Sequence, residues 1–118
     1  MNRIKVSVIV TTKNEARHIA NCLESVKKQS LGDYDIETIV VDNASIDNTK
    51  EIALRYTPNV FNWGPERSAQ RNFGVLKAQG DYILYLDADM IPDKEVISSC
   101  MQAVSRDPQI VALYIQKS

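Results

Sequence analysis

The sequence predicts an α/β fold in which helices flank an open, mostly parallel sheet. Runs rich in β-branched residues, at 4–12 and 36–41, have the near-continuous apolar character of buried parallel strands. Segments with apolar residues at helical spacing alternate with such runs along the chain, without repeats, and this alternation is typical of α/β domains. The 118 residues suffice for one hydrophobic core, so residues 1–118 are expected to form a single domain.

The first half begins with a strand over 4–12, which ends in two hydroxyl residues. Asn14 suits the N-cap of the helix that follows. That helix has an apolar face at helical spacing, made by Ala16, Ile19, Ala20, Leu23 and Val26. The second predicted strand, 36–41, ends at Asp42.

Capping and turn residues crowd positions 43–49, ahead of a short helix. Asn48 and Glu51 have the spacing of a capping box, and Asp47 competes for the cap. The helix is predicted from Ile52, Ala53 and Tyr56. A short third strand is expected at 60–63.

The second half repeats the alternation. Pro65 is expected to begin a helix, since proline is tolerated in the first turn. Its predicted packing face consists of Ala69, Phe73 and Leu76. A strand at 82–86 precedes a helix that starts at Pro92 and stops at residues 107–108, and residues 110–115 form a fifth predicted strand.

The overall charge and the cysteines exclude several classes of function. Fourteen Lys and Arg against fifteen Asp and Glu give no broad field for nucleic acid or anionic membrane. No apolar run approaches the ~20 residues of a membrane span. We therefore expect a cytoplasmic chain, with membrane association only through a partner or a portion outside this sequence. Cys22 and Cys100 are far apart, which argues against a zinc site and favours buried free thiols.

The first, second and fourth predicted strands end in polar residues. Right-handed crossovers would place these strand ends along one edge of the sheet, and ligands bind there at a switch in strand order. The residues gathered at this edge would be Thr11, Thr12, Asp42, Asp87 and Asp89. An acidic triplet after a strand is also common in turns, so its spacing alone leaves a turn open.

A nucleoside diphosphate would give these carboxylates distinct roles. A hard divalent cation at Asp89, with Asp87 beside it or on a ribose hydroxyl, would neutralise the two phosphates. The small Ala88 between them would let a ligand approach closely. Asp42 would accept protons from the base or ribose, although a turn or cap role fits that residue equally well.

The third predicted helix adds positive charge. Arg67 and Arg71 lie one turn apart and could clasp phosphate, and Gly74 on the next turn would allow close backbone approach. A solvated basic face is the alternative, and it suits Arg67 better than Arg71. His18 is expected to be exposed and without a catalytic role.

Five ordered blocks of the chain together resemble family 2 glycosyltransferases with the GT-A fold. The blocks are residues 8–15, 22–26, 39–49, 68–74 and 80–89. Among them are Thr-Thr-Lys-Asn-Glu after the first strand, Arg-Asn-Phe-Gly in the third helix and Leu-Asp-Ala-Asp at the acidic triplet. The resemblance covers about residues 5 to 95.

This resemblance implies a domain that binds a nucleotide-diphosphate sugar together with Mg or Mn. It places the metal at Asp87 and Asp89. It implies donor contacts from Thr11, Thr12, Asn14, Glu15, Asp42, Arg71, Asn72, Asp87 and Ala88. The family's reaction is an inverting displacement, in which an acceptor hydroxyl attacks the anomeric carbon while a general base removes its proton.

Two features depart from the family pattern. Thr11 and Lys13 replace the usual proline and aromatic residue, so stacking of a tyrosine on the base is lost. The family's acceptor pocket and general base lie beyond the acidic triplet, where this chain has one more helix and strand. Asp93 and Glu95 follow the triplet, but their spacing identifies no base. We therefore expect a truncated donor half and assign no catalytic residue.

Other functions remain open from the sequence alone. A non-catalytic nucleotide-sugar-binding fragment is one. A haloacid-dehalogenase-type phosphatase would use Asp87 as its nucleophile, but that motif normally opens its domain. A receiver-like signalling domain needs an acidic pair after its first strand, where this chain has Thr11 and Thr12. The acceptor, whether glycan, lipid or protein, is not identified, and self-association could cover apolar sheet surface that a half domain leaves exposed.

Overall fold

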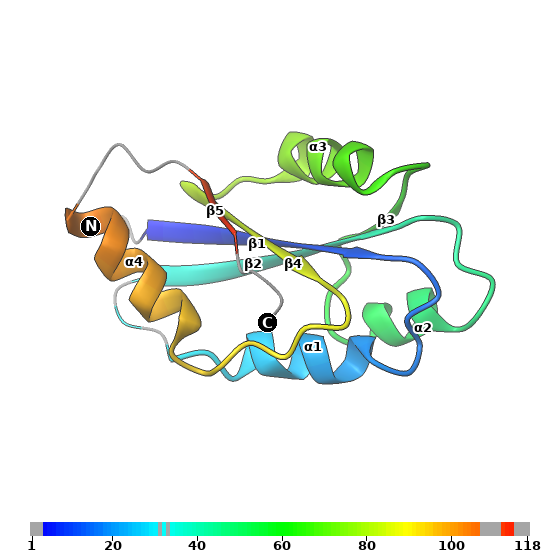
Figure 1. Cartoon of the computed structure of the whole chain (residues 1–118), viewed down its shortest axis with the longest axis horizontal. Coiled ribbons are helices and arrows are strands. Elements are labelled where there is room, and N and C mark those ends of the chain that lie inside the picture. The colour runs from blue at the N-terminus through cyan, green and yellow to red at the C-terminus, as the bar shows by residue number, and fades with distance from the viewer. Residues whose placement is uncertain (1–3, 31, 33, 107–111, 115–118) are drawn as a thin grey trace.

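The computed structural model of the chain describes residues 4–30, 32, 34–106 and 112–114. Its strands are β1 (Ile4–Thr12), β2 (Tyr34–Asp42), β3 (Val60–Asn62), β4 (Tyr82–Asp87) and β5 (Ala112–Tyr114). They form one sheet in the order β3-β2-β1-β4-β5 (Figure 1), and every neighbouring pair is parallel. The predicted fold class is confirmed.

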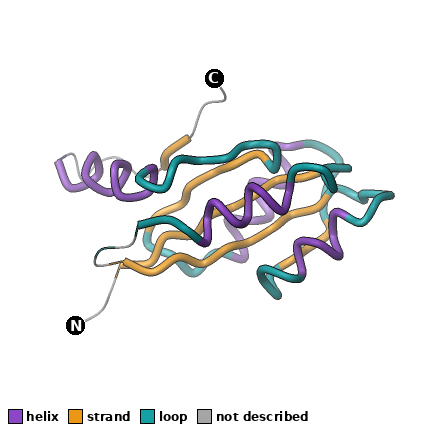
Figure 2. Tube along the Cα trace, turned by 90° about the horizontal axis from the view of Figure 1, so that it is seen from below, coloured by secondary structure: helices purple, strands orange, loops and turns teal. Residues whose placement is uncertain are grey.

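The helices cover the two faces of the sheet unequally. They are α1 (Ile19–Lys27), α2 (Thr49–Leu54), α3 (Arg67–Lys77) and α4 (Val96–Arg106). In Figure 1, α1 and α2 lie below the sheet and α3 lies above it, while α4 lies at the left of the strands. Residues of α4 belong to the same core cluster as residues of α1 and α2. Figure 2, seen from below, shows helices lying in front of the strands. In the described residues no helix is long and apolar enough to cross a membrane.

Strand β1 is the centre of the core. Val8, Ile9 and Val10 are completely buried, and successive side chains of a strand point to opposite faces. Val8 and Val10 accordingly pack with residues of α1, including Ile19, Cys22, Leu23 and Val26. Ile9 packs on the other face with Ile39 and Val41, against Phe73 of α3. The β-branched run therefore supplies both layers of the core.

Helix α3 approaches the sheet through a glycine. A Cβ at Gly74 would lie 2.6 Å from Cγ2 of Ile9, so the absence of a side chain lets the helix lie close to β1. The buried residues of α3 are Gln70 and Gly74. Leu76 was predicted to pack, but it is 81% exposed, because the helix turns its Gln70–Gly74 face to the sheet.

The predicted starts of three helices are wrong, and one of these is α4, which begins at Val96 and not at Pro92. Helix α1 begins after His18 and not after Asn14, because Asn14 adopts a positive φ of 53° and bonds to the next loop. Helix α3 has Glu66 at its N-cap, so Pro65 lies just outside it. Asn48 is at the N-cap of α2, as predicted, but its side chain makes no cap bond.

Other predictions fall partly outside the described part of the chain. The expected helix stop at residues 107–108 lies there, as do three positions of the strand expected at 110–115. The described residues of that strand, 112–114, pair with β4.

Candidate functional site

The strand ends that carry polar residues are neighbours at one edge of the sheet. Thr12 at the end of β1 is in register with Asp42 of β2, and Thr11 is in register with Asp87 of β4. The chain runs from β1 outward to β2 and β3, and then crosses to β4 on the other side of β1. The strand order thus reverses between β1 and β4, the position where open α/β sheets bind ligands.

A pocket of about 200 Å³ opens at this reversal. Its lining comes from Thr11, Thr12, Lys13, Glu15, Arg67, Gln70, Asp87, Ala88 and Asp89. The predicted site residues Thr11, Thr12, Glu15, Asp87, Ala88 and Asp89 are thus brought together. Four other predicted donor contacts, Asn14, Asp42, Arg71 and Asn72, do not line the pocket.

A larger hollow, of about 490 Å³, lies elsewhere, between α1, β2 and α2. It is lined by Leu23, Val26, Lys27, Asp35, Ile36, Thr38 and Tyr56. This hollow has the larger volume, but the polar residues that end β1 and β4 line the smaller pocket and not this one. We therefore assign the candidate site to the smaller one.

Asp87 contacts three side chains at the pocket. Its Oδ1 accepts a hydrogen bond of 3.2 Å from the Thr11 hydroxyl. The same oxygen lies 3.4 Å from Nε of Arg67 and 3.8 Å from Nη2 of Arg71. The Arg71 guanidinium also lies over the Tyr85 ring, 5.4 Å from its centroid. Two guanidinium groups therefore face one carboxylate, and the predicted pairing of Arg67 and Arg71 on one side of α3 is confirmed.

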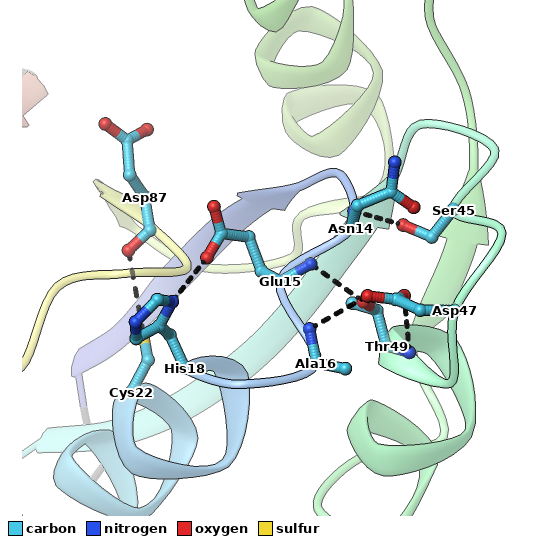
Figure 3. Close-up of polar contacts among 9 residues, drawn as sticks. All are labelled: Asn14, Glu15, Ala16, His18, Cys22, Ser45, Asp47, Thr49 and Asp87. Carbon is cyan, nitrogen blue, oxygen red and sulfur yellow. Dashed lines mark hydrogen bonds and ion pairs between the residues drawn. The ribbon is translucent and has the colours of Figure 1, made fainter.

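Two loops at this edge are tied together by hydrogen bonds (Figure 3). The Asn14 amide donates to Oγ of Ser45 at 2.8 Å. The Ile46 amide donates to Oδ1 of Asn14 at 2.8 Å. The Glu15 amide donates to Oγ1 of Thr49 at 2.9 Å. These bonds explain why Asn14 is held outside α1, and they fix the loop that carries Glu15.

Asp47 strengthens the same junction. Its carboxylate accepts the Ala16 amide at 3.2 Å, the Thr49 amide at 3.0 Å and the Thr49 hydroxyl. The hydroxyl bond from Thr49 is the main reason that the pKa of Asp47 lies below its ordinary value. Asp47 thus supplies the side-chain cap of α2 that Asn48 does not.

Asp42 holds its own loop in shape. Its side chain accepts the Ser45 amide at 2.9 Å and the Ser45 hydroxyl at 2.5 Å, and the residue is 1% exposed. This geometry is the turn role that the sequence left open. A carboxylate can accept further bonds, so its contact with a donor stays a prediction, as do those of Asn14, Arg71 and the exposed Asn72.

Cys22 packs beneath the acidic triplet. Its Sγ donates to the backbone oxygen of Asp87 at 3.8 Å (Figure 3). Burial, with the nearby charges of Asp89 and Asp87, raises the pKa of the Cys22 thiol to about 12. Both cysteines are free; Cys22 is buried, as predicted, whereas Cys100 is only partly buried. His18 is exposed, also as predicted, but its Nδ1 lies 2.9 Å from Oε2 of Glu15, a partner that the sequence did not identify.

Gln70 is the pocket residue that sequence reasoning missed. It is 4% exposed, and its Nε2 donates to the backbone oxygens of Thr12, at 3.0 Å, and Val41, at 2.8 Å. The available signal was its position four residues before Gly74, on the face of α3 that contacts the sheet. A polar side chain on a buried helix face needs hydrogen-bond partners.

The donor groups of the pocket fit a hard divalent cation. Asp87 and Asp89 supply carboxylate oxygens, the ligands that Mg²⁺ and Mn²⁺ prefer. Oγ1 of Thr12 is buried without a hydrogen-bond partner among the described residues. No group of three or more His, Cys, Asp or Glu side chains that could hold a metal occurs in that part of the chain. Mg²⁺ commonly takes one or two carboxylates and completes its shell with substrate phosphates and water.

Comparison with known protein families gives one match over most of the chain. The family described as "Glycosyl transferase family 2" matches residues 7–117. Among curated proteins, glycosyltransferase AglE of Haloferax volcanii is 34% identical over 107 residues, which cover 85% of this chain and 35% of the relative. The poly(ribitol-phosphate) beta-N-acetylglucosaminyltransferase TarS of Staphylococcus aureus is 30% identical over 124 residues, covering 97% of this chain and 21% of TarS.

Solved structures give the same result. The mannosyltransferase PcManGT from Pyrobaculum calidifontis, in complex with GDP-Man and Mn²⁺, is 27% identical with a TM-score of 0.77, covering 92% of this chain and 34% of that one. S. aureus TarS 1-349, in complex with UDP-GlcNAc, is 29% identical with a TM-score of 0.74, covering 87% of this chain and 32% of that one. The chain therefore spans about a third or less of the length of these relatives.

Proposed function

Because the chain belongs to glycosyl transferase family 2, we propose that its pocket binds the diphosphate of a nucleotide-sugar donor and that it supplies the donor half of a sugar-transfer reaction. The observation that carries this proposal is the convergence of Thr11, Thr12, Asp87 and Asp89 on one pocket at the strand-order reversal. The GDP-Man and UDP-GlcNAc complexes of similar proteins support the donor class. The two donors differ in base and sugar, so we propose neither a particular base nor a particular sugar for this chain.

Asp87 and Asp89 would hold the divalent metal, Mg²⁺ or Mn²⁺. When bound, the metal would neutralise charge on the two phosphates and so stabilise the departing nucleoside diphosphate. Arg67 lines the same pocket, and its guanidinium can contact phosphate oxygens. Thr11 donates to Oδ1 of Asp87, which orients that carboxylate. The unpartnered Thr12 hydroxyl provides a further group for a donor or a metal-bound water.

We further propose that the transfer inverts the anomeric centre, as the family resemblance implies. The acceptor hydroxyl would attack the anomeric carbon on the side opposite the leaving diphosphate, and a general base would take its proton. We assign no residue to that base. The acceptor is a hydroxyl-bearing glycan, lipid or protein.

The experiment that tests donor binding is a calorimetric titration of the chain with UDP and with GDP. Each titration is run with Mn²⁺ and again with EDTA. We expect binding of at least one nucleotide that is strong with Mn²⁺ and lost with EDTA. Absence of metal-dependent binding with both nucleotides would refute the proposal.

One alternative is a chain that binds the donor without turning it over. The observation that favours it is that the pocket lining supplies groups for a donor and a metal, while no residue is assigned as the general base. Release of nucleoside diphosphate from a panel of nucleotide sugars distinguishes the two functions, because a binding fragment releases none. The family match over residues 7–117 argues against the phosphatase and receiver alternatives.

A further inference from the structure

The buried amide of Gln70 bridges the ends of two strands. Its Nε2 donates to the carbonyl of Thr12 on β1, at 3.0 Å, and to the carbonyl of Val41 on β2, at 2.8 Å. The two bonds use both N–H groups of the amide. An apolar side chain of similar size would fill the same space on this face of α3. The amide of Gln70 therefore contributes hydrogen bonds in addition to packing.

These bonds lie at the last rung between β1 and β2. The Thr12 carbonyl also accepts the amide of Asn43 at 2.9 Å, the first residue beyond β2. A carbonyl has two lone pairs and can accept both donors. Gln70 therefore supports the rung at which the two strands separate, next to the side chains of Thr12 and Asp42.

The same stretch of α3 also reaches the other side of the pocket. Arg67, three residues earlier, and Arg71, the next residue, place their guanidinium groups 3.4 Å and 3.8 Å from Oδ1 of Asp87 on β4. Four residues after Gln70, Gly74 sets the close approach of α3 to β1. One helix thus connects the ends of β1 and β2 to that of β4, and Gln70 is its hydrogen-bonded contact with the first two.

We propose that Gln70 is a positioning residue of the donor pocket. It holds the last rung of β1 and β2 against α3, and thereby sets where the Thr12 hydroxyl and the two guanidinium groups lie relative to Asp87. The donor-binding part of this inference rests on the proposed function; the structural part does not.

The test replaces Gln70 by residues of similar volume without N–H donors. Gln70→Met and Gln70→Leu are compared with Gln79→Leu, a matched control at an exposed glutamine just after α3. For each protein, calorimetry gives the Kd for UDP or GDP with Mn²⁺, and hydrogen exchange followed by NMR gives the protection of the Asn43 amide. We expect the two Gln70 variants to bind about tenfold more weakly, the size of one or two lost hydrogen bonds.

The exchange measurement separates positioning from a general loss of stability. We expect the Asn43 amide to exchange about tenfold faster in either Gln70 variant, while amides in the middle of β1 keep their protection. Met is flexible and close to Gln in shape, so we expect Gln70→Met to fold. The test needs only one of the two Gln70 variants to be folded. Gln79→Leu should change neither quantity.

Three results would overturn the inference. One is a Gln70 variant with the wild-type Kd and wild-type Asn43 exchange. Another is weaker binding with unchanged exchange, which would make Gln70 a direct ligand contact. The third is an equal loss in Gln79→Leu. If the unmodified chain binds no nucleotide, the proposed function fails, and unchanged Asn43 exchange in Gln70→Met would then separately refute the structural role.

Discussion

Asp87 of the acidic triplet contacts groups from another strand and from helix α3. Oδ1 of Asp87 faces Thr11 and the two guanidinium groups of α3, so much of its charge is already compensated within the chain. The metal site was expected at this triplet from the family resemblance, since the spacing alone left a turn open. The compensation of Asp87 depends on α3, which joins the site only in the folded chain, so the sequence could not reveal it.

Loss of Asp89 should remove the metal dependence of nucleotide binding. We expect Asp89→Asn to weaken binding of UDP or GDP in the presence of Mn²⁺ by about tenfold or more, because a lost interaction with a charged group costs on the order of 1.5 kcal/mol or more. Calorimetry with and without Mn²⁺ measures the effect. Asp93→Asn, at an exposed aspartate outside the pocket lining, is the control, and equal effects of the two substitutions would contradict the assignment.

Asp47 should shape the acid side of the stability profile. Because its native pKa is lowered from 3.8, its carboxylate stabilises the fold at pH values above 3.8, and this contribution is lost as the pH falls through the lowered native pKa. Asp47→Asn should therefore be less stable than wild type near neutral pH, and the difference should shrink in acid. Thermal unfolding of both proteins, from about pH 6 to about pH 2, measures this difference in stability. Glu51→Gln, at an exposed acid on α2, is the control, and a constant difference between Asp47→Asn and wild type at every pH would rule the effect out.

Helix α3 is the element that organises the site. It packs on β1 through Gly74, bonds the ends of β1 and β2 through Gln70, and reaches β4 through Arg67 and Arg71. Sequence reasoning found the pairing of the two arginines and a close backbone approach at Gly74, but it did not identify β1 as the partner of that approach. It placed Leu76 wrongly in the core, because the apolar spacing of Ala69, Phe73 and Leu76 was given more weight than the small residue at Gly74.

A side chain at Gly74 should push α3 away from the sheet. A methyl group there would meet the fully buried Ile9 at 2.6 Å, and overpacking of this kind costs about 1–3 kcal/mol. The gain in helix propensity offsets about 1 kcal/mol, so we expect Gly74→Ala to lower the free energy of unfolding by about 1 kcal/mol. Denaturant unfolding measures it. Gly32→Ala, whose added Cβ would lie 3.7 Å from the nearest atom, should be within about 0.5 kcal/mol of wild type, and a Gly74→Ala chain as stable as wild type would show that the contact can relax.

At the scale of the whole molecule, the fold class and the succession of strands and helices could be predicted, whereas the strand order and several helix starts were not. The β-branched runs locate β1 and β2, and the alternation of strands with amphipathic segments gives the parallel sheet. The edge that holds the pocket also followed, because strand direction decides which residues end beside one another. The bonds between the loops, such as Asn14 with Ser45 and Glu15 with Thr49, could not be predicted, since they join residues about 30 positions apart that pattern rules do not connect.

The central claim is that a nucleoside diphosphate and a divalent metal bind together where β1 and β4 end. Paramagnetic broadening of backbone amide signals by Mn²⁺, in the presence of UDP or GDP, tests it most directly. The account predicts the strongest broadening at Thr11, Thr12 and Asp87–Asp89, and little at Ile4 and Tyr34, which lie at the other end of the strands, about 26 Å away at 3.3 Å per residue. Broadening centred on Ile4 and Tyr34, or spread evenly over the chain, would contradict it.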